Sequence, residues 1–201
     1  MAFLGQPEAV TPEDAFKRLK EGNRRFVSAK ALRPNQSTLR RQAVLKGQRP
    51  FAAVLSCSDS RVPLEIVFDC GIGDLFVVRN MGNALSEAAI AALEYAVQTL
   101  GVRFVLVVGH SDCDAVKAAL VSDAQAPKMQ AALSLLKPAI DKVRSEPGDT
   151  VLKAAAENVR MSVAQLRACE PIIAEKVKSG QVIIAGAYYS VGNAVVDFMN
   201  A

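Results

Sequence analysis

Four short runs of mostly apolar residues, each containing β-branched residues, constrain the fold more than any other feature of the sequence. They are FAAVLS (51–56), LFVVR (75–79), FVLVVG (104–109) and VIIAGAY (182–188), each bounded by turn-forming residues. Uninterrupted apolar runs of this length are typical of strands buried on both faces. Segments with helical periodicity separate them. The alternation predicts an α/β fold, with a central, mostly parallel β-sheet flanked by helices.

Helical patterns lie before, between and after these runs. They are expected over residues 12–29, 86–100 and 112–121, and as at least three helices within 128–178, where Pro138, EPGD (146–149) and Pro171 mark the breaks. At the first helix, Thr11 suits the N-cap and Pro12 the first helical position.

The length and composition predict one globular domain. We expect a single domain over residues 1–201, with an N-terminal helical arm over 1–49 and an α/β core over 50–201. The chain is 51% hydrophobic and 22% charged, which argues against disorder. No apolar run approaches the roughly 20 residues of a membrane span, and the start, MAFLGQPEAV, lacks the features of a signal peptide. We therefore expect a cytoplasmic protein with no membrane association and reduced cysteines.

Basic residues concentrate in the first quarter of the chain. Between Lys17 and Arg49 there are eleven Lys or Arg and one acidic residue, Glu21. Such a stripe can contact nucleic acid or an anionic surface. Because aromatic residues suited to base stacking are not interleaved with it, we favour a solvated helical arm packed on a partner chain and expect no nucleic-acid partner. An RNA-binding or partner-binding module is the weaker alternative.

Candidate metal ligands follow two of the four apolar runs. FAAVLS leads directly into Cys57, and FVLVVG leads into His110 and Cys113. In α/β sheets, ligand sites gather at the carboxyl ends of the parallel strands, so two thiols and one imidazole would converge if these strands are neighbours. A Cys2His set favours zinc over magnesium, calcium or manganese.

The spacing of these residues does not by itself decide between a metal site and a core histidine. His110 is the only histidine of the chain, and one histidine at a strand end also fits a buried structural role. The metal interpretation and the structural one are evenly matched on spacing alone. The remaining cysteines, Cys70 and Cys169, have no ligand-type neighbour and are interpreted as structural.

Three separated motifs together resemble the β-class carbonic anhydrases. They are CSDSRVP (57–63), GDLFVVRNMGN (73–83) and GHSDC (109–113). The likeness covers about residues 12–121 and is weaker beyond, although GQVIIAGAYY resembles the last core strand of the family. The resemblance implies one zinc ion per chain, held by Cys57, His110 and Cys113.

The resemblance also implies roles for four further residues. Asp59 and Arg61 match an Asp–Arg dyad that orients the zinc-bound hydroxide attacking carbon dioxide, and Asp59 would become a fourth zinc ligand if Arg61 released it. Gln48 matches a glutamine that hydrogen-bonds bicarbonate. Tyr95 matches an apolar wall of the pocket, and both are typically presented near a subunit interface.

The expected activity is therefore zinc-dependent, reversible hydration of carbon dioxide to bicarbonate and a proton, in a homodimer or a dimer of dimers. Two alternatives stay open, namely hydrolysis of carbonyl sulfide or carbon disulfide at the same zinc site, and a zinc-binding family member without catalysis. Asp114 stands where the family usually has glycine. We expect its carboxylate to cap the helix that begins at Cys113, with an altered mechanism as the alternative.

Overall fold

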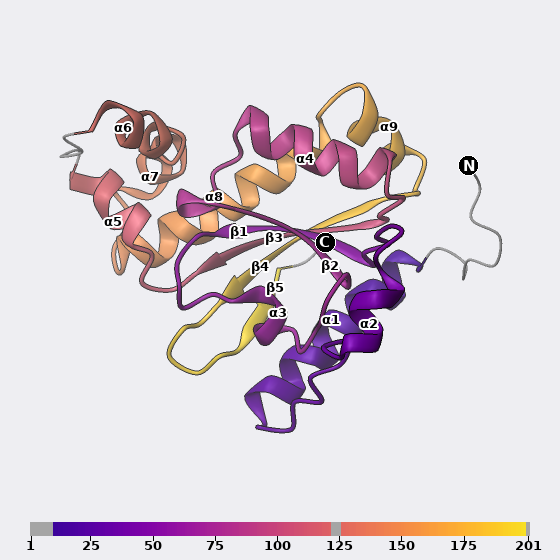
Figure 1. Cartoon of the computed structure of the whole chain (residues 1–201). Coiled ribbons are helices and arrows are strands. Elements are labelled where there is room, and N and C mark those ends of the chain that lie inside the picture. Colours follow the sequence, from indigo (N-terminus) through magenta and orange to yellow (C-terminus); the bar gives the residue numbers. More distant parts are fainter. Residues whose placement is uncertain (1–9, 122–125, 200–201) are drawn as a thin grey trace.

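The computed structural model describes residues 10–121 and 126–199, and a five-stranded sheet forms its centre (Figure 1). The strands are β1 (Ala52–Cys57), β2 (Leu75–Asn80), β3 (Phe104–His110), β4 (Ile183–Tyr189) and β5 (Val196–Phe198). Their order is β2-β1-β3-β4-β5, with β5 antiparallel to β4 and all other pairs parallel. The predicted α/β fold is confirmed, and the four apolar runs form its four parallel strands.

Helices precede and connect these strands. They are α1 (Pro12–Val27), α2 (Thr38–Ala43), α3 (Leu64–Val67), the 3-10 turn η1 (Met81–Asn83), α4 (Glu87–Gln98), α5 (Asp114–Val121), α6 (Pro127–Ser134), α7 (Lys137–Val143), α8 (Thr150–Arg167) and α9 (Ile172–Lys178). The expected cap of α1 is confirmed, because the Thr11 hydroxyl accepts the Asp14 N–H at 3.1 Å. Unlike the longer helices, α2, α3 and the strand β5 were not expected, since elements this short carry no periodic signal.

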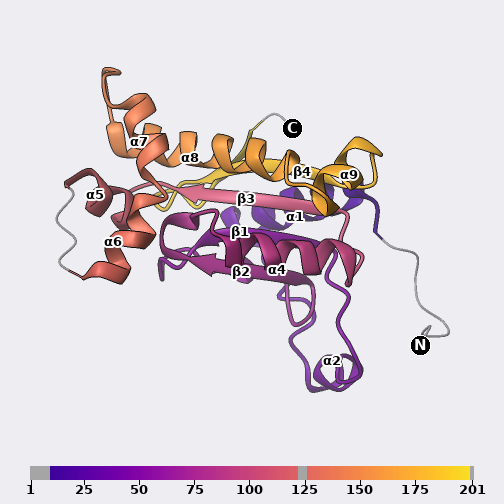
Figure 2. The same cartoon turned by 90° about the horizontal axis from the view of Figure 1, so that it is seen from above.

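Helices cover both faces of the sheet, with α4, α8 and α9 on one face and α1 and α3 on the other (Figures 1 and 2). Successive side chains of β1 point to opposite faces of the sheet. Ala53 and Leu55 pack toward α4 and α8, whereas Ala52 and Val54 pack toward α1 and α3. A strand whose alternate side chains pack into two apolar layers must be apolar at every position, which explains the uninterrupted runs.

Two glycines allow α8 to approach the sheet closely. A Cβ atom on Gly109 would lie 2.8 Å from the Val159 side chain, and one on Gly186 would lie 2.7 Å from it. Both distances are shorter than carbon atoms tolerate, so a side chain at either glycine would displace the helix. The two glycines lie on β3 and β4, and the first directly precedes His110.

The prediction that all four apolar strands are buried on both faces is wrong for β2. Every residue of β1 and β3 is buried, whereas β2 is half-buried along most of its length and exposed at Arg79. The reason is its position at the edge of the sheet, where it pairs with β1 alone. The apolar side chains of β2 therefore stay partly uncovered by the described part of the chain.

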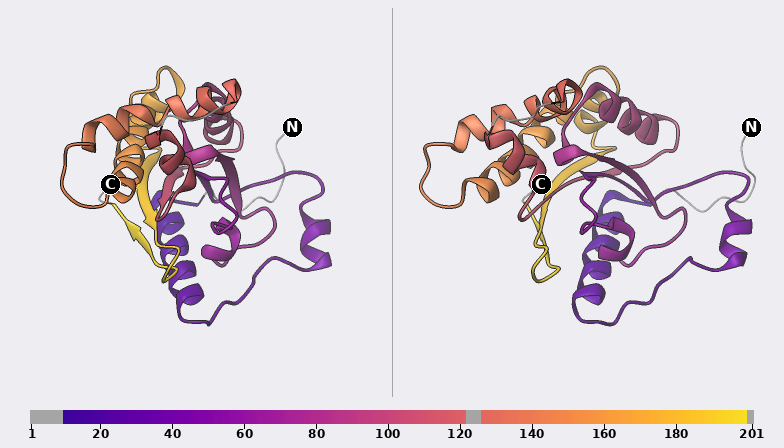
Figure 3. Two further views of the ribbon diagram at one scale, coloured as in Figure 1. Left: turned by 90° about the vertical axis from the view of Figure 1, so that its left-hand side faces the viewer. Right: turned by 60° about the vertical axis from the view of Figure 1, so that its left-hand side comes forward.

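Residues 10–49 contain two different parts. Helix α1 packs on the sheet through Ala15 and Leu19, which are fully buried. Residues 28–49, here called the arm, extend from the body (Figure 3), and no residue of α2 is buried. The boundary between arm and core at residues 49 and 50 stays a prediction. Among the described helices, none is both long and apolar enough to cross a membrane.

Candidate metal centre

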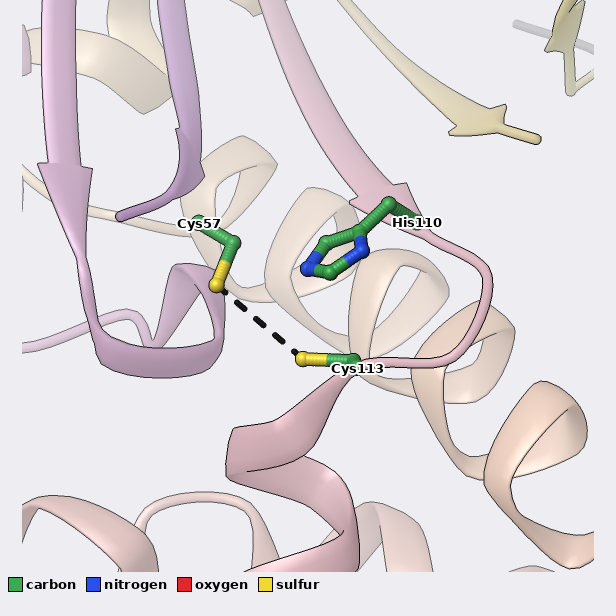
Figure 4. Close-up of side chains that lie close together, drawn as sticks. All are labelled: Cys57, His110 and Cys113. Atoms are coloured by element: carbon green, nitrogen blue, oxygen red, sulfur yellow. Dashed lines mark hydrogen bonds between the residues drawn. The ribbon is translucent and has the colours of Figure 1, made fainter. Parts of the chain in front are cut away.

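Three potential ligands meet at the carboxyl ends of β1 and β3. Cys57 ends β1, His110 ends β3, and Cys113 directly precedes α5, so that the three side chains point toward one another (Figure 4). Their ligand atoms all lie within 4.8 Å of one another, and all three residues are buried. The parallel pairing of β1 with β3 produces this arrangement, because it aligns residues that are more than fifty positions apart in the sequence.

The orientation of the imidazole leaves one ring nitrogen for a metal. The Nδ1 atom of His110 lies 2.9 Å from the Ser111 carbonyl oxygen, to which it donates as N–H. That tautomer leaves Nε2 as a lone-pair acceptor. This Nε2 atom is buried and has no hydrogen-bond partner in the described part of the chain. Because buried polar atoms rarely lack partners, an unpaired nitrogen beside two thiols fits a metal ligand.

The Cys57 and Cys113 sulfur atoms are 4.0 Å apart and form a hydrogen bond. Hydrogen bonding from the Cys113 thiol is the main factor that lowers the pKa of Cys57, to about 4, and two backbone N–H groups assist against the effect of burial. The same interaction, together with burial, raises the pKa of Cys113. The hydrogen bond between the two sulfur atoms therefore favours the thiolate form of Cys57 over that of Cys113.

Arg79 supports the backbone of the ligand loop, a role that the sequence alone did not reveal. Its Nε atom donates to the Cys57 carbonyl oxygen at 2.9 Å, and its Nη2 atom donates to the Asp59 carbonyl oxygen at 2.6 Å. The residue belongs to the GDLFVVRNMGN motif, so the signal was present. Its function becomes visible only once the register places it opposite Ser56, next to Cys57.

Asp59 and Arg61 form a two-point ion pair beside the three ligands. The Arg61 Nε atom donates to Asp59 Oδ1 at 2.9 Å, and Nη2 donates to Oδ2 at 2.6 Å. Arg61 is the main cause that holds the pKa of Asp59 well below its usual range, so this carboxylate stays ionised. The Asp59 Oδ2 atom lies 3.9 Å from His110 Nε2, which places a permanent hydrogen-bond acceptor at the edge of the cluster.

Within one chain, the structure does not bring Gln48 or Tyr95 to the cluster. Gln48 lies before the start of β1, whereas Cys57 lies at the end of that strand. The two ends of β1 are about 17 Å apart along the strand axis. Tyr95 lies near the end of α4, is 47% exposed, and contacts Phe76 near the start of β2. Both residues are therefore closer to the amino ends of the strands. Their roles stay predictions that require a second subunit.

Asp114 does not cap α5 in the expected way. Its carboxylate pairs with Lys117 at 3.1 Å and lies 3.8 Å from the Arg61 guanidinium. Backbone N–H groups of the first turn instead donate hydrogen bonds to the Cys113 sulfur, because α5 begins at Asp114 and Cys113 is the residue before it. The negative charge of Asp114 still lies in the first turn, where the helix dipole favours it.

The other two cysteines do not join the cluster. Cys70 is buried and its thiol donates to the Phe68 carbonyl oxygen at 3.3 Å, while Cys169 is half-buried and packs beside the core formed with α4 and α9. Neither belongs to a group of potential metal ligands among the described residues.

Comparisons with known proteins agree with this geometry. The sequence model of the carbonic anhydrase family matches residues 52–196, which include the three potential ligands. Carbonic anhydrase 2 of Mycobacterium tuberculosis is 37% identical over 193 residues, covering 93% of each chain.

Solved structures show the same fold. The β-carbonic anhydrase CcaA superposes with a TM-score of 0.73 at 26% identity, over 92% of this chain and 99% of that one. Two β-carbonic anhydrases of the ascomycete Sordaria macrospora, described as tetrameric, give a TM-score of 0.73 at 24% identity, over 94% of this chain and 98% of that one. With the matching family model and a relative 37% identical along nearly its whole length, the chain belongs to the β-carbonic anhydrase family of enzymes.

Proposed function

We propose that this protein catalyses the reversible hydration of carbon dioxide to bicarbonate and a proton, with one zinc ion held by Cys57, His110 and Cys113. The observation that carries the proposal is the unpaired Nε2 atom of His110, which faces two thiols in a buried cluster. Two thiols and one imidazole are ligands that zinc prefers, and three protein ligands leave one position open in a tetrahedral site.

Zinc at such a position supplies a Lewis acid that lowers the pKa of a bound water molecule. The contribution of the protein is orientation. Asp59 is ionised and has no proton to donate, so it can only accept a hydrogen bond. At 3.9 Å from His110 Nε2, it can fix the direction of a reacting O–H group and so aim the oxygen lone pair at the substrate.

Arg61 has two effects on Asp59. It keeps the carboxylate ionised, and it occupies both carboxylate oxygens so that they point toward the guanidinium. The ligands are also surrounded by apolar residues, including Ala84, Ala115 and Val116. An apolar wall beside the cluster suits an uncharged, nonpolar substrate such as carbon dioxide.

We also propose that the active form is a dimer or a dimer of dimers. The half-buried apolar strand β2 and the arm with its exposed leucines supply surfaces that one chain leaves uncovered. Gln48 and Tyr95 lie on this side of the molecule and would act across the boundary. The Sordaria relatives described as tetrameric are consistent with this assembly.

A cytoplasmic location stays a prediction from the sequence. The four cysteines are all free thiols in the structure, which suits a reducing compartment.

Stopped-flow measurement of carbon dioxide hydration, with zinc content measured on the same sample, tests the proposal. We expect one zinc ion per chain and activity that rises with pH between about pH 7 and 9. A protein that contains one zinc ion per chain and shows no hydration over this range would instead be the non-catalytic alternative. The same assay with carbonyl sulfide or carbon disulfide tests the hydrolase alternative.

A further inference from the structure

Arg61 is held on two sides, not only by Asp59. Asp59 binds one edge of the guanidinium, at 2.9 and 2.6 Å. On the other side, Arg61 Nη1 donates to Asp112 Oδ2 and Nη2 donates to the Asp112 carbonyl oxygen, both at 3.0 Å. A guanidinium is planar with five N–H donors in a rigid fork. Four contacts from two aspartates therefore define its orientation.

Asp112 is itself fixed in place. Its backbone adopts φ 57°, in a tight turn between β3 and α5. The Ser111 N–H donates to the Tyr189 carbonyl oxygen at 2.9 Å, which ties this turn to the end of β4. The Lys117 ammonium binds the second oxygen of Asp112 and also the Asp114 carboxylate, so that Asp112 forms an ion pair on each of its two oxygens.

Through these contacts, Arg61 joins the two loops that carry the potential metal ligands. Asp59 lies in the loop that follows Cys57, and Asp112 lies between His110 and Cys113. The Asp59 carboxylate is only 3.9 Å from His110 Nε2, so a loose Arg61 would leave an anionic oxygen ligand free beside the centre. Asp112 binds Arg61 through both its carboxylate and its carbonyl oxygen, and so restrains the guanidinium from the second loop.

We propose that Asp112, held by Lys117, is a positioning residue that fixes Arg61 on Asp59 and thereby prevents the Asp59 carboxylate from binding the metal. Asp114, 3.8 Å from Arg61, adds a weaker contact in the same direction. The inference rests on the proposed function, because it assumes a metal at Cys57, His110 and Cys113 with one position open to outside ligands.

Azide binding to the cobalt(II)-loaded protein, followed by visible absorption, measures access to that position. We expect Asp112→Asn to raise the azide Kd about two- to fivefold, the range of partly exposed ion pairs. Asparagine adopts positive φ readily, so the turn is retained. Asp112→Gly, which also accepts this φ, removes the side chain entirely and is expected to raise the Kd at least as much.

The direction of the change separates positioning from simple electrostatics. Removal of a negative charge near the centre would by itself tighten the binding of an anion, whereas release of Asp59 as a competing ligand weakens it. In an Asp59→Asn background no carboxylate can compete, so Asp112→Asn should no longer weaken azide binding. Asp141→Asn removes an exposed carboxylate that pairs only loosely with Arg144, at 3.9 Å, and is the matched control. It should leave the azide Kd unchanged.

An unchanged or lower azide Kd in both Asp112 variants would overturn the proposal, as would an equal weakening in the Asp59→Asn background. Carbon dioxide hydration by the same samples separates this result from the proposed function. Weakened azide binding without any hydration in the wild type would reject the proposed activity and leave the positioning role intact. Normal hydration with unchanged azide binding would reject the positioning role alone.

Discussion

The metal centre and the arm differ in how far their side chains are buried. At the metal centre, every potential ligand is buried and ends or follows a fully buried strand. In the arm, Leu32, Leu39 and Leu45 are 72%, 76% and 80% exposed. The first region completes its packing within one chain, whereas the second presents apolar side chains that nothing in the described part of the chain covers.

The difference separates two classes of predicted site residue. Cys57, His110, Cys113, Asp59 and Arg61 are brought together by contacts within the chain. Gln48 lies near the end of the arm and Tyr95 lies beside the edge strand, so both belong to the uncovered side. A subunit boundary would convert this uncovered side into part of the site, and the following predictions test that division.

The largest expected effect is at the metal centre. His110→Ala should bind much less than one zinc ion per chain and lower kcat/KM for carbon dioxide hydration about a thousandfold or more, because the Lewis acid is lost. Elemental analysis and stopped-flow kinetics measure both. Cys70→Ala removes a buried thiol outside the cluster and should retain the zinc. Full zinc occupancy in His110→Ala would exclude this ligand set.

The next effect concerns the arm. Leu39→Gln combined with Leu45→Gln should weaken subunit association about a hundredfold or more, because burial of each leucine stabilises a contact by about 1.5–3 kcal/mol. Sedimentation equilibrium measures the dissociation constant. Leu152→Gln, a half-exposed position on α8, is the control and should not change it. Equal association in the double variant would show that the arm does not contact a partner.

A third prediction concerns the joint between the arm and the body. Asp69 accepts hydrogen bonds from Arg25 Nε at 2.6 Å and from the backbone N–H groups of Leu32 and Arg33 at 2.9 and 2.8 Å. Because these bonds lie in a buried setting and end on a charged acceptor, Asp69→Asn should lower the free energy of unfolding by about 2 kcal/mol at neutral pH.

The same joint should be sensitive to acid. Burial acts to raise the pKa of Asp69, but Arg25 and the two backbone N–H groups outweigh it and leave the pKa below its usual value. A depressed pKa means that this stabilisation is present above the unfolded-state pKa, about 3.9, and is lost as pH falls through the folded-state value. Urea unfolding at several pH values should show the wild type and Asp69→Asn converging under acid. A constant difference would contradict the linkage.

The smallest expected effect is at Gln48. Gln48→Ala should lower kcat/KM for bicarbonate dehydration by about tenfold or less, the contribution of one hydrogen bond, while zinc content stays unchanged. The effect should vanish in the dissociated form of the double leucine variant, because Gln48 would act only across the boundary. An equal effect in monomer and oligomer would place Gln48 in the site of its own chain.

The strands were the most predictable part of the fold. Burial on both faces requires an apolar residue at every position, so a strand of this kind can be predicted from one apolar run of the sequence. The edge position of β2 was not visible, because an edge strand and a central strand differ only in their neighbours. The short strand β5 and helix α2 could not be predicted from sequence periodicity either. Strand β5 depends on its pairing with β4, and no residue of α2 is buried within the chain.

The candidate site was predictable from its motifs and not from its spacing. Cys57 and His110 are separated by more than fifty residues. Their positions at strand ends bring them together only if β1 and β3 are neighbours, which the sequence does not show and the strand pairing does. Arg79 belonged to a recognised motif, yet its contact with the Cys57 carbonyl depends on strand register. The contact of Asp112 with Arg61 depends on a turn with positive φ that the sequence did not indicate.

The sequence by itself determined the local properties of this protein: strands apolar on both faces, a capped first helix, and side chains suited to zinc at two strand ends. Only the tertiary structure decided which of these meet, namely that β1 and β3 are neighbours, that His110 turns Nε2 toward two thiols, and that Arg61 lies between two aspartates. The physical reason is that propensity and ligand chemistry belong to single residues, whereas strand order, ring orientation and ion-pair geometry depend on distant segments packed against one another.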